Sequence, residues 1–437
     1  MPQAKRCWSP LKRPDFTGDL WAEKAEGCYI YDEKGIKRID AYSGLWNVNL
    51  GYGKKCIIDA VNSQLNTLPY VNPIRFTTEM IQNLSSLLHD ITHDEIEKII
   101  YTCSGSESIE VAIKLARKYA AISGRAGSLI GVISNSYHGN YYGSMSATSY
   151  DEAHKRDYAP FVDGFIKFSM PYCRCCETNN IKKDCRERML DTLNSEFSEV
   201  KESLSAVIVE TVLSSAGVIP VFEEYIKTLY KLCAENGVLF ICDEVATGFY
   251  RTGALFSFQK YGIKPQIIAL SKGVTNGYLP FGAVCVSRDI CELFNQKNEI
   301  FYHLSTQNCN PVCAAASIAT INELLKDDMA QRVKDLSDSF DLSLRNELSI
   351  FECVYEIRTA GLMFAVDIVD VKGAPIDENT LFRIVSKIYD LGCVVGFGFI
   401  SGLTSSIILM PIYCTPPRES RMISRIIKNA LYEYEIC

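Results

Sequence analysis

The sequence predicts an α/β protein with a mostly parallel central sheet flanked by helices, together with a smaller α+β domain. Apolar runs such as AVIVE (206–210) and VLFICDE (238–244) are hydrophobic at successive positions, as in strands covered on both faces. Helical patterns alternate with such runs, for example over 107–121 and 223–236. Alternating strands and helices are typical of a parallel sheet between helical layers.

The elements follow from local pattern. Residues 27–42 alternate apolar and polar side chains around a turn at 33–35, which predicts a β-hairpin. From about 57 to 91, apolar residues recur at spacings of three and four, which indicates helix. Strands of the central sheet are expected at 98–103, 129–134, 205–211, 238–245, 266–271 and 281–287.

The pattern changes after about Leu325, where a polar helix (329–348) is followed by strands, a helix near 381–391, further strands and a closing helix. The predicted organisation therefore has three parts. Residues 1–55 form an N-terminal segment that packs with the small domain. Residues 56–325 form the large α/β domain, and residues 326–437 form the small α+β domain.

Composition excludes several classes of protein. Hydrophobic residues make up 47% of the 437 and charged residues 22%, which is typical of a globular chain. The 45 basic and 52 acidic residues give a net charge of −7 without long charged runs, so neither a nucleic-acid nor a membrane partner is expected. The first residues lack the apolar core of a signal peptide. Eighteen cysteines without such a signal predict free thiols and a cytoplasmic protein.

An acid and an amine follow two of the predicted strands. Asp243 ends one apolar strand, and Lys272 directly follows another. Ligands of open α/β sheets bind beyond the carboxyl ends of the strands, so both side chains are expected at one rim. Pyridoxal phosphate requires such a pair, because its aldehyde forms a Schiff base with lysine and its ring nitrogen sits beside a carboxylate. On spacing alone, a loop lysine and a helix-capping aspartate remain the commoner interpretation.

A helix beginning after the strand at 98–103 could hold the phosphate. In YTCSGSESIE, Ser104 and Glu107 fit the S-x-x-E capping box, which explains the motif without any ligand. The free N–H groups of Gly105 and Ser106 at the same helix start would also bind a phosphate. Both interpretations predict the same helix, and only the second requires an anion.

Two further residues, Tyr137 and Thr306, can be assigned to a cofactor site only when other motifs support the assignment. Tyr137 follows a strand and precedes His138 and Gly139, so its ring could lie against a flat cofactor, although a core tyrosine is the commoner explanation. Thr306 precedes an alanine-rich helix that begins with proline, and by itself it reads as a loop or capping hydroxyl.

Taken together, these stretches resemble the class III aminotransferases, which are pyridoxal-phosphate enzymes of fold type I. The resemblance covers nearly the whole chain, and its most specific parts are DEVATGFYRTG (243–253) and LSKG (270–273). It implies a ping-pong transfer of an amino group from an amine or amino acid to a ketone or aldehyde. A racemase, epimerase or aminomutase on the same fold is the alternative. A non-catalytic relative would be expected to lack Lys272 or Asp243.

The resemblance also implies roles for individual residues. Lys272 would form the Schiff base and shuttle the proton, and Asp243 would pair with the pyridine nitrogen. Val245 and Tyr137 would pack on opposite faces of the ring. The phosphate would be held by three residues, of which the last would come from the neighbouring subunit of a homodimer: Gly105, Ser106 and Thr306.

The segment SGLWNVNLGYG (43–53) looks most like the β-alanine–pyruvate and ω-amine branch, in which the residue matching Trp46 lines the substrate pocket. A half-buried aromatic at the domain junction is an equal alternative for Trp46. Many members also carry an arginine near the C-terminus that grips a substrate carboxylate. Here the aligned positions, Ile400 or Ile407, are apolar, so the usual clamp is expected to be absent. At least one substrate is then expected either to lack that carboxylate or to bind it through another residue.

The stretch PYCRCCETNNIKKDC places four cysteines at C-x-C-C-x8-C: Cys173, Cys175, Cys176 and Cys185. Four thiols can bind zinc, but structural zinc sites more often show C-x2–4-C pairs. The spacing therefore favours an insertion loop with free thiols, and no metal site is predicted.

Overall fold

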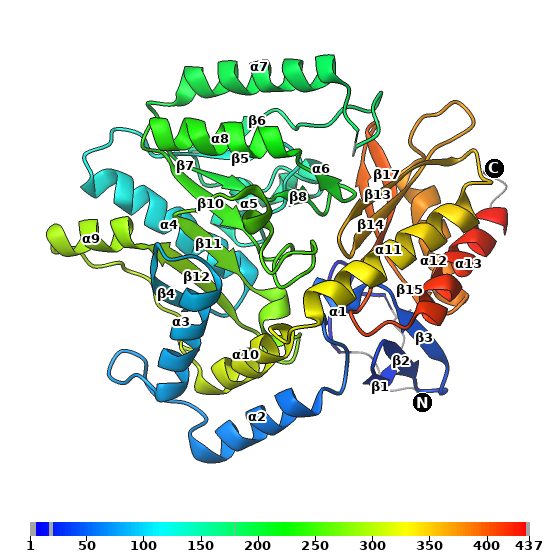
Figure 1. Ribbon diagram of the computed structural model, residues 1–437, viewed down its shortest axis with the longest axis horizontal. Helices are drawn as coiled ribbons and strands as arrows, with labels where there is room; N and C mark the ends of the chain where they lie inside the picture. Colours follow the sequence, from blue (N-terminus) through cyan, green and yellow to red (C-terminus); the bar gives the residue numbers. More distant parts are fainter. Residues whose placement is uncertain (1–5, 17–20, 179, 434–437) are drawn as a thin grey trace.

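The computed structural model describes residues 6–16, 21–178 and 180–433. Parts of the predicted N-terminal segment (1–5 and 17–20), Asn179 and the last four residues of the predicted small domain lie outside the described residues. A seven-stranded sheet with helices on both faces forms one side of the molecule, and smaller sheets built from both ends of the chain form the other (Figure 1).

The seven-stranded sheet is mostly parallel. In spatial order its strands are β4 (Ile96–Thr102), β12 (Gly282–Ser287), β11 (Ile267–Leu270), β10 (Leu239–Asp243), β7 (Leu204–Val209), β5 (Leu129–Ile133) and β6 (Phe165–Phe168). Only β12, among the described strands of this sheet, runs antiparallel to its neighbours. The predicted α/β class with a mostly parallel central sheet is confirmed.

Both faces of this sheet are buried, which explains the continuous apolar runs. In β7, Ala206 and Ile208 face one core cluster while Val207 and Val209 face the other. The first cluster lies under α4 (Gly105–Ile122) and α9 (Arg288–Gln296). Helices on the opposite face include α3 (Glu79–Ile91), α8 (Glu223–Glu235) and α10 (Pro311–Leu324).

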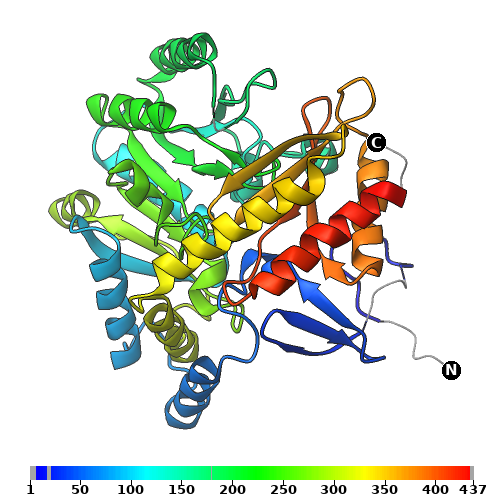
Figure 2. The same cartoon turned by 45° about the vertical axis from the view of Figure 1, so that its right-hand side comes forward.

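The C-terminal part forms an antiparallel sheet of β13 (Val354–Ala360), β14 (Met363–Ile368), β17 (Thr404–Leu409) and β16 (Gly396–Ile400). Its helices are α11 (Met329–Leu348), α12 (Glu378–Asp390) and α13 (Pro417–Glu433), which lie beside it in Figure 2. The N-terminal strands β1 (Ala22–Glu26), β2 (Tyr29–Asp32) and β3 (Lys37–Asp40) join β15 (Cys393–Val394) in another sheet. Because β3 pairs with β15, the N-terminal strands are joined to the C-terminal part of the chain.

Some elements differ from the expectations. The helical stretch predicted over 57–91 is two helices, α2 (Lys55–Thr67) and α3, because Pro69 and Pro73 interrupt it. The sequence interpretation missed β6 and the polar helix α7 (Lys183–Val200), which has a narrow buried stripe. The remaining short elements are α1 (Ser43–Trp46), α5 (Tyr142–Ala147), α6 (Glu152–Lys155), β8 (Val212–Leu213), β9 (Ile219–Pro220), and the 3-10 turns η1 (Arg156–Tyr158), η2 (Ser257–Tyr261) and η3 (Lys272–Thr275).

No helix in the described part of the chain combines the length and the apolar content needed to cross a bilayer. Sixteen of the described cysteines carry free thiols, as expected, whereas Cys353 is disulfide-bonded.

Candidate active site

Two neighbouring parallel strands bring the predicted acid and amine to one cavity. Asp243 is the last residue of β10 and lies opposite Ala269 of β11, and Lys272 begins η3 just after β11 ends. The cavity has a volume of about 140 Å³. It is lined by Trp46, Ser104, Gly105, Ser106, Tyr137, His138, Gly139, Glu210, Asp243, Val245, Ala246 and Lys272. All of the predicted site residues except Thr306 are in this set.

Asp243 is held by hydrogen bonds from two directions. His138 Nδ1 lies 2.8 Å from Asp243 Oδ2, and the backbone N–H of Val245 donates to Oδ1 over 3.1 Å. Both Asp243 and His138 are buried. A carboxylate fixed in this way at the edge of a cavity can pair with a protonated ring nitrogen. The sequence alone predicts no role for His138, because its partner Asp243 lies 105 positions away.

The amine of Lys272 faces an aromatic wall. Its Nζ lies 4.6 Å from the centre of the Trp46 ring. Burial lowers the pKa of Lys272, while the negative charges of Asp243 and Glu210 oppose that shift. A lower pKa increases the neutral fraction of the amine, which is the form that attacks an aldehyde or accepts a proton. The backbone of Lys272 has φ +42°, a left-handed conformation that is uncommon for a lysine.

The start of α4 forms the floor of the cavity. Ser104 Oγ accepts the N–H of Glu107 at 3.2 Å, and the Glu107 carboxylate accepts the N–H of Cys103 at 2.7 Å. The Ser104 half of the predicted capping box is therefore present, whereas Glu107 bonds the residue before the cap instead of Ser104 itself. Gly105 and Ser106 occupy the first turn, where backbone N–H groups have no partner within the helix. This geometry is the one that binds phosphate groups.

Close packing explains why glycines stand at two positions of this floor. A Cβ on Gly105 would lie 2.7 Å from Val245 Cγ1. Gly139 has φ +129°, and a Cβ there would lie 2.6 Å from Ser106 Oγ. The Ser106 hydroxyl accepts the N–H of Asn140 at 3.1 Å, so its own proton is available to an anion. The residues present thus fit the phosphate, the ring nitrogen and the aldehyde of pyridoxal phosphate.

Trp46 lies at a position compatible with both interpretations of its role. It belongs to a small core cluster and is only 8% exposed, yet its ring also lines the cavity. Its ring packs edge-on against Tyr42 at 5.9 Å between centroids. Because α1 carries Trp46 from the N-terminal part of the chain, that part contributes a wall of the site.

Glu210 supplies a second acidic group. It is buried, and its two carboxylate oxygens accept the backbone N–H groups of Tyr137 and Ser214 at 2.8 and 3.4 Å. Burial raises the pKa of Glu210 to about 7, with nearby His138 lowering it and Asp243 raising it. Glu210 therefore bonds backbone groups, and no arginine of the described residues pairs with it.

The positions expected for a carboxylate clamp lie elsewhere. Ile407 is fully buried in β17, and Ile400 ends β16. Arg251 is buried near the cavity, but its guanidinium donates to Asn49 Oδ1 at 2.6 Å and to the Pro411 carbonyl at 2.8 Å. Among the described residues, no arginine lines the cavity.

Thr306 is the one predicted site residue that its own chain does not bring to the cavity. It lies exposed in the segment before α10, where its carbonyl accepts the hydroxyl of Tyr70 at 2.7 Å. A contact from a neighbouring subunit, as expected for this residue, requires such an exposed position.

Comparison with known proteins identifies the family. The profile of the family Aminotransferase class-III matches residues 14–431. The uncharacterized aminotransferase YhxA of Bacillus subtilis is 31% identical over 431 residues, or 97% of this chain and 94% of that protein. Putrescine–pyruvate aminotransferase of Pseudomonas aeruginosa is 31% identical over 383 residues, or 84% of this chain and 83% of that protein.

Solved structures agree with the sequence comparison. A Bacillus anthracis aminotransferase superposes with a TM-score of 0.90 at 29% identity, over 98% of this chain and 96% of that one. An (S)-enantioselective omega-transaminase from Thermomicrobium roseum gives 0.91 at 26% identity, with the same coverage. The pyridoxamine-phosphate-bound aminotransferase of Vibrio fluvialis gives 0.88 at 25% identity, over 96% and 94%. The chain belongs to the class III aminotransferase family and is a pyridoxal-phosphate-dependent aminotransferase.

Proposed function

We propose that the cavity residues divide the work of transamination among four groups. Lys272 holds the cofactor aldehyde and moves the substrate proton, and Asp243 holds the ring nitrogen. Tyr137 and Val245 flank the ring, and the α4 start, Gly105 and Ser106, holds the phosphate. When bound, the cofactor supplies an electron sink for the negative charge that develops on the substrate carbon.

The surroundings of Lys272 and Asp243 suit these tasks. Burial lowers the pKa of Lys272 and so keeps a larger fraction of its amine neutral, which is the form that accepts a proton. The His138 contact keeps Asp243 oriented toward the cavity as an acceptor. Similar proteins with a named activity are aminotransferases, which favours transamination over the racemase and mutase alternatives.

We further propose that the amino donor carries no carboxylate at the clamp position, and that diamines or other amines are preferred. One observation carries this proposal: the cavity wall holds the acidic Glu210 and no arginine among its described residues. A negative Glu210 repels a donor carboxylate and attracts a second ammonium group. Putrescine–pyruvate aminotransferase, a relative at 31% identity, supports an amine donor by its name.

Two donors of equal length test this preference. 1,4-Diaminobutane and 4-aminobutyrate differ at one end, where one carries an ammonium group and the other a carboxylate. We expect kcat/KM to be at least about tenfold higher for the diamine at pH 8, since a single favourable charge contact is worth about 1–2 kcal/mol. Glu210→Gln should reduce the ratio of kcat/KM for the diamine to kcat/KM for 4-aminobutyrate. Equal or higher kcat/KM for 4-aminobutyrate would contradict the proposal.

The proposed active unit is a homodimer in which Thr306 reaches the phosphate of the partner's site. Support comes from large apolar side chains left exposed near Thr306, including Ile300, Tyr302 and Leu304, at 79%, 91% and 56%. Exposed apolar groups that cluster in this way favour association. We also propose a cytoplasmic location, which the free thiols support, and domain boundaries after residues 55 and 325.

A further inference from the structure

Four cysteines gather at one point between β6 and α7. Cys173, Cys175 and Cys176 lie in the connecting segment, and Cys185 is in the first turn of α7. Their four Sγ atoms all lie within 4.8 Å of one another. A turn closed by the Cys176 N–H on the Cys173 carbonyl, at 3.1 Å, brings the first three together. The fold thus brings Cys185 next to the other three cysteines, although eight residues separate it from Cys176. That spacing is not typical of a zinc motif in sequence.

The sulfurs lie close enough together to surround one ion, although one pair is closer than in a tetrathiolate site. Cys173 Sγ lies 2.9 Å from Cys175 Sγ and 3.6 Å from Cys185 Sγ, and the Cys175 and Cys185 sulfurs are 4.0 Å apart. Zinc bound tetrahedrally at about 2.3 Å from each sulfur would separate the ligands by about 3.8 Å. Small side-chain movements would therefore suffice to place one ion between them.

Hydrogen-bond donors point at the sulfurs. The backbone N–H of Lys182 donates to Cys176 Sγ at 3.5 Å, and Arg188 Nη2 donates to Cys185 Sγ at 3.5 Å. Cys185 also sits at the N-terminal end of α7, where the helix dipole favours negative charge. Donors of this kind around the ligands stabilise thiolates and orient them toward a metal.

One side of the cysteine cluster is buried against apolar side chains, and the other side is exposed to solvent. Cys176 and Cys185 are buried in a small apolar cluster, with Ile181 beside them and Phe222 packed against it. Cys175 is exposed. An ion can therefore enter from solvent past Cys175 and be held against an apolar wall.

We propose that Cys173, Cys175, Cys176 and Cys185 bind one structural zinc ion. On binding, the four thiols lose their protons to solvent and form four S–Zn bonds. The resulting centre carries a charge of −2, and nothing is oxidised or reduced. All four positions are filled by protein, which leaves no open site for catalysis and gives the ion a structural role.

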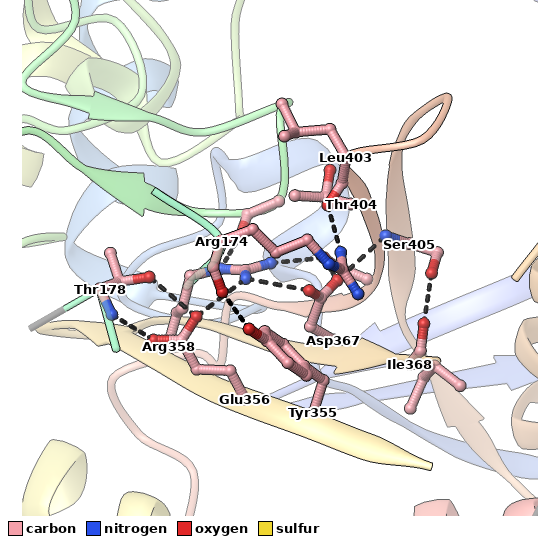
Figure 3. Close-up of polar contacts among 12 residues, drawn as sticks. Arg174, Thr178, Tyr355, Glu356, Arg358, Asp367, Ile368, Leu403, Thr404 and Ser405 are labelled. Atoms are coloured by element: carbon pink, nitrogen blue, oxygen red, sulfur yellow. Dashed lines mark hydrogen bonds and ion pairs between the residues drawn. The ribbon is translucent and has the colours of Figure 1, made fainter. Parts of the chain in front are cut away.

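The segment that the ion would hold is docked on the C-terminal sheet. Arg174, between the first two cysteines, donates from Nη1 to the Leu403 carbonyl at 2.5 Å and from Nη2 to the Gly373 carbonyl at 2.9 Å. Its guanidinium lies over the ring of Tyr355 at 4.6 Å, and the Tyr355 hydroxyl donates to the Arg174 carbonyl (Figure 3).

A second contact follows the cysteines. The N–H and hydroxyl of Thr178 both donate to the Glu356 carboxylate, at 2.5 and 2.8 Å (Figure 3). Glu356 also accepts Arg358 Nη1 at 3.2 Å on the same strand, β13. Zinc would therefore fix a segment anchored in the seven-stranded sheet against the C-terminal sheet, and none of its four ligands lines the cavity of the cofactor residues.

Metal analysis of the holoenzyme tests the proposal. The protein is purified without chelators or metal-affinity resin, and its metals are counted by mass spectrometry. We expect about one zinc ion per chain. In Cys173→Ser/Cys175→Ser, zinc should fall at least about tenfold. Cys291→Ser is the matched control, because α9 packs at the opposite edge of the sheet, and it should retain full zinc.

A second measurement does not depend on the variants folding. Wild-type protein produced with cobalt in place of zinc should show the visible absorption of tetrahedral cobalt thiolate, at longer wavelengths than the cofactor band. Zinc-free wild-type protein, zinc content unchanged in the double variant, stoichiometric iron, or a disulfide within the four cysteines would each overturn the proposal.

Limited proteolysis tests the structural role. Trypsin has sites at Arg174 and Lys182 within the held segment. Stripping zinc from the holoenzyme with a chelator should accelerate cleavage there several-fold, because the segment loses an anchor. Cleavage at an unchanged rate would overturn the role assigned to the ion.

Discussion

Asp243 and Glu244 are consecutive buried acids that face different surroundings. Asp243 lines the cavity, whereas Glu244 points away and accepts the Thr247 hydroxyl at 2.6 Å and the Phe258 N–H at 2.8 Å. Asp243→Asn should lower kcat roughly a hundredfold or more, because a neutral amide cannot hold the ring nitrogen protonated. The matched change Glu244→Gln should leave kcat nearly unchanged. Equal losses in both variants would contradict the role of Asp243.

The titration of Glu244 should also make the stability of the fold depend on pH. Burial raises its pKa from 4.5 to about 7, with the Thr247 hydrogen bond opposing the shift. The folded state then binds a proton that the unfolded state releases, so this group's contribution to stability falls as pH rises from about 5 to about 7. Glu244→Gln should lack that fall, so its Tm relative to wild type should rise over this range.

Thermal unfolding at a series of pH values measures the effect. Glu199→Gln, an exposed position on α7, is the control and should track wild type throughout. A constant difference in Tm between Glu244→Gln and wild type would show that Glu244 does not titrate as described.

At the scale of elements, the start of α4 is expected to bind the cofactor only if position 105 carries no side chain. A side chain at Gly105 would collide with Val245, and either residue must shift to relieve the contact. Gly105→Ala should therefore weaken cofactor binding at least about tenfold while leaving α4 helical. Equilibrium dialysis of the cofactor measures the affinity, and unchanged affinity would show that this helix start is not the phosphate site.

Elements with strong local signals were predictable from sequence, and weakly patterned ones were not. The apolar run ending at Asp243 and the capping pair Ser104 and Glu107 are local features, so β10 and the start of α4 were found where expected. The edge strand β6 has four residues and only one fully buried side chain. Helix α7 buries three of its eighteen residues, too few for a clear period.

At the scale of the whole molecule, contacts between distant residues were beyond sequence reasoning. The His138–Asp243 pair, the isolation of Arg251 from the cavity and the closure of the cysteine cluster all depend on how separate elements pack. The motifs that resemble class III aminotransferases nevertheless pointed to residues that do line the cavity. Those residues meet there because β10, β11 and α4 bring their ends to one edge of the sheet.

The proposed homodimer can be tested with hybrid molecules. Lys272→Ala removes the amine, and Thr306→Asp places a negative charge where the phosphate should bind. If Thr306 serves the partner's site, a dimer of the two variants contains one intact site. Randomly mixed chains should then regain roughly a quarter of wild-type activity, since half of the dimers are hybrids. No regain would place Thr306 outside the partner's site.

The most direct test of the central claim is a single half-reaction. Cofactor-loaded enzyme is mixed with one donor at a time and no acceptor, and the absorbance of the cofactor is followed. We predict that 1,4-diaminobutane converts the cofactor stoichiometrically to its pyridoxamine form, that Lys272→Ala does not, and that donors bearing a carboxylate react more slowly. Absence of lasting conversion with any amine, or conversion only by α-amino acids, would contradict the account.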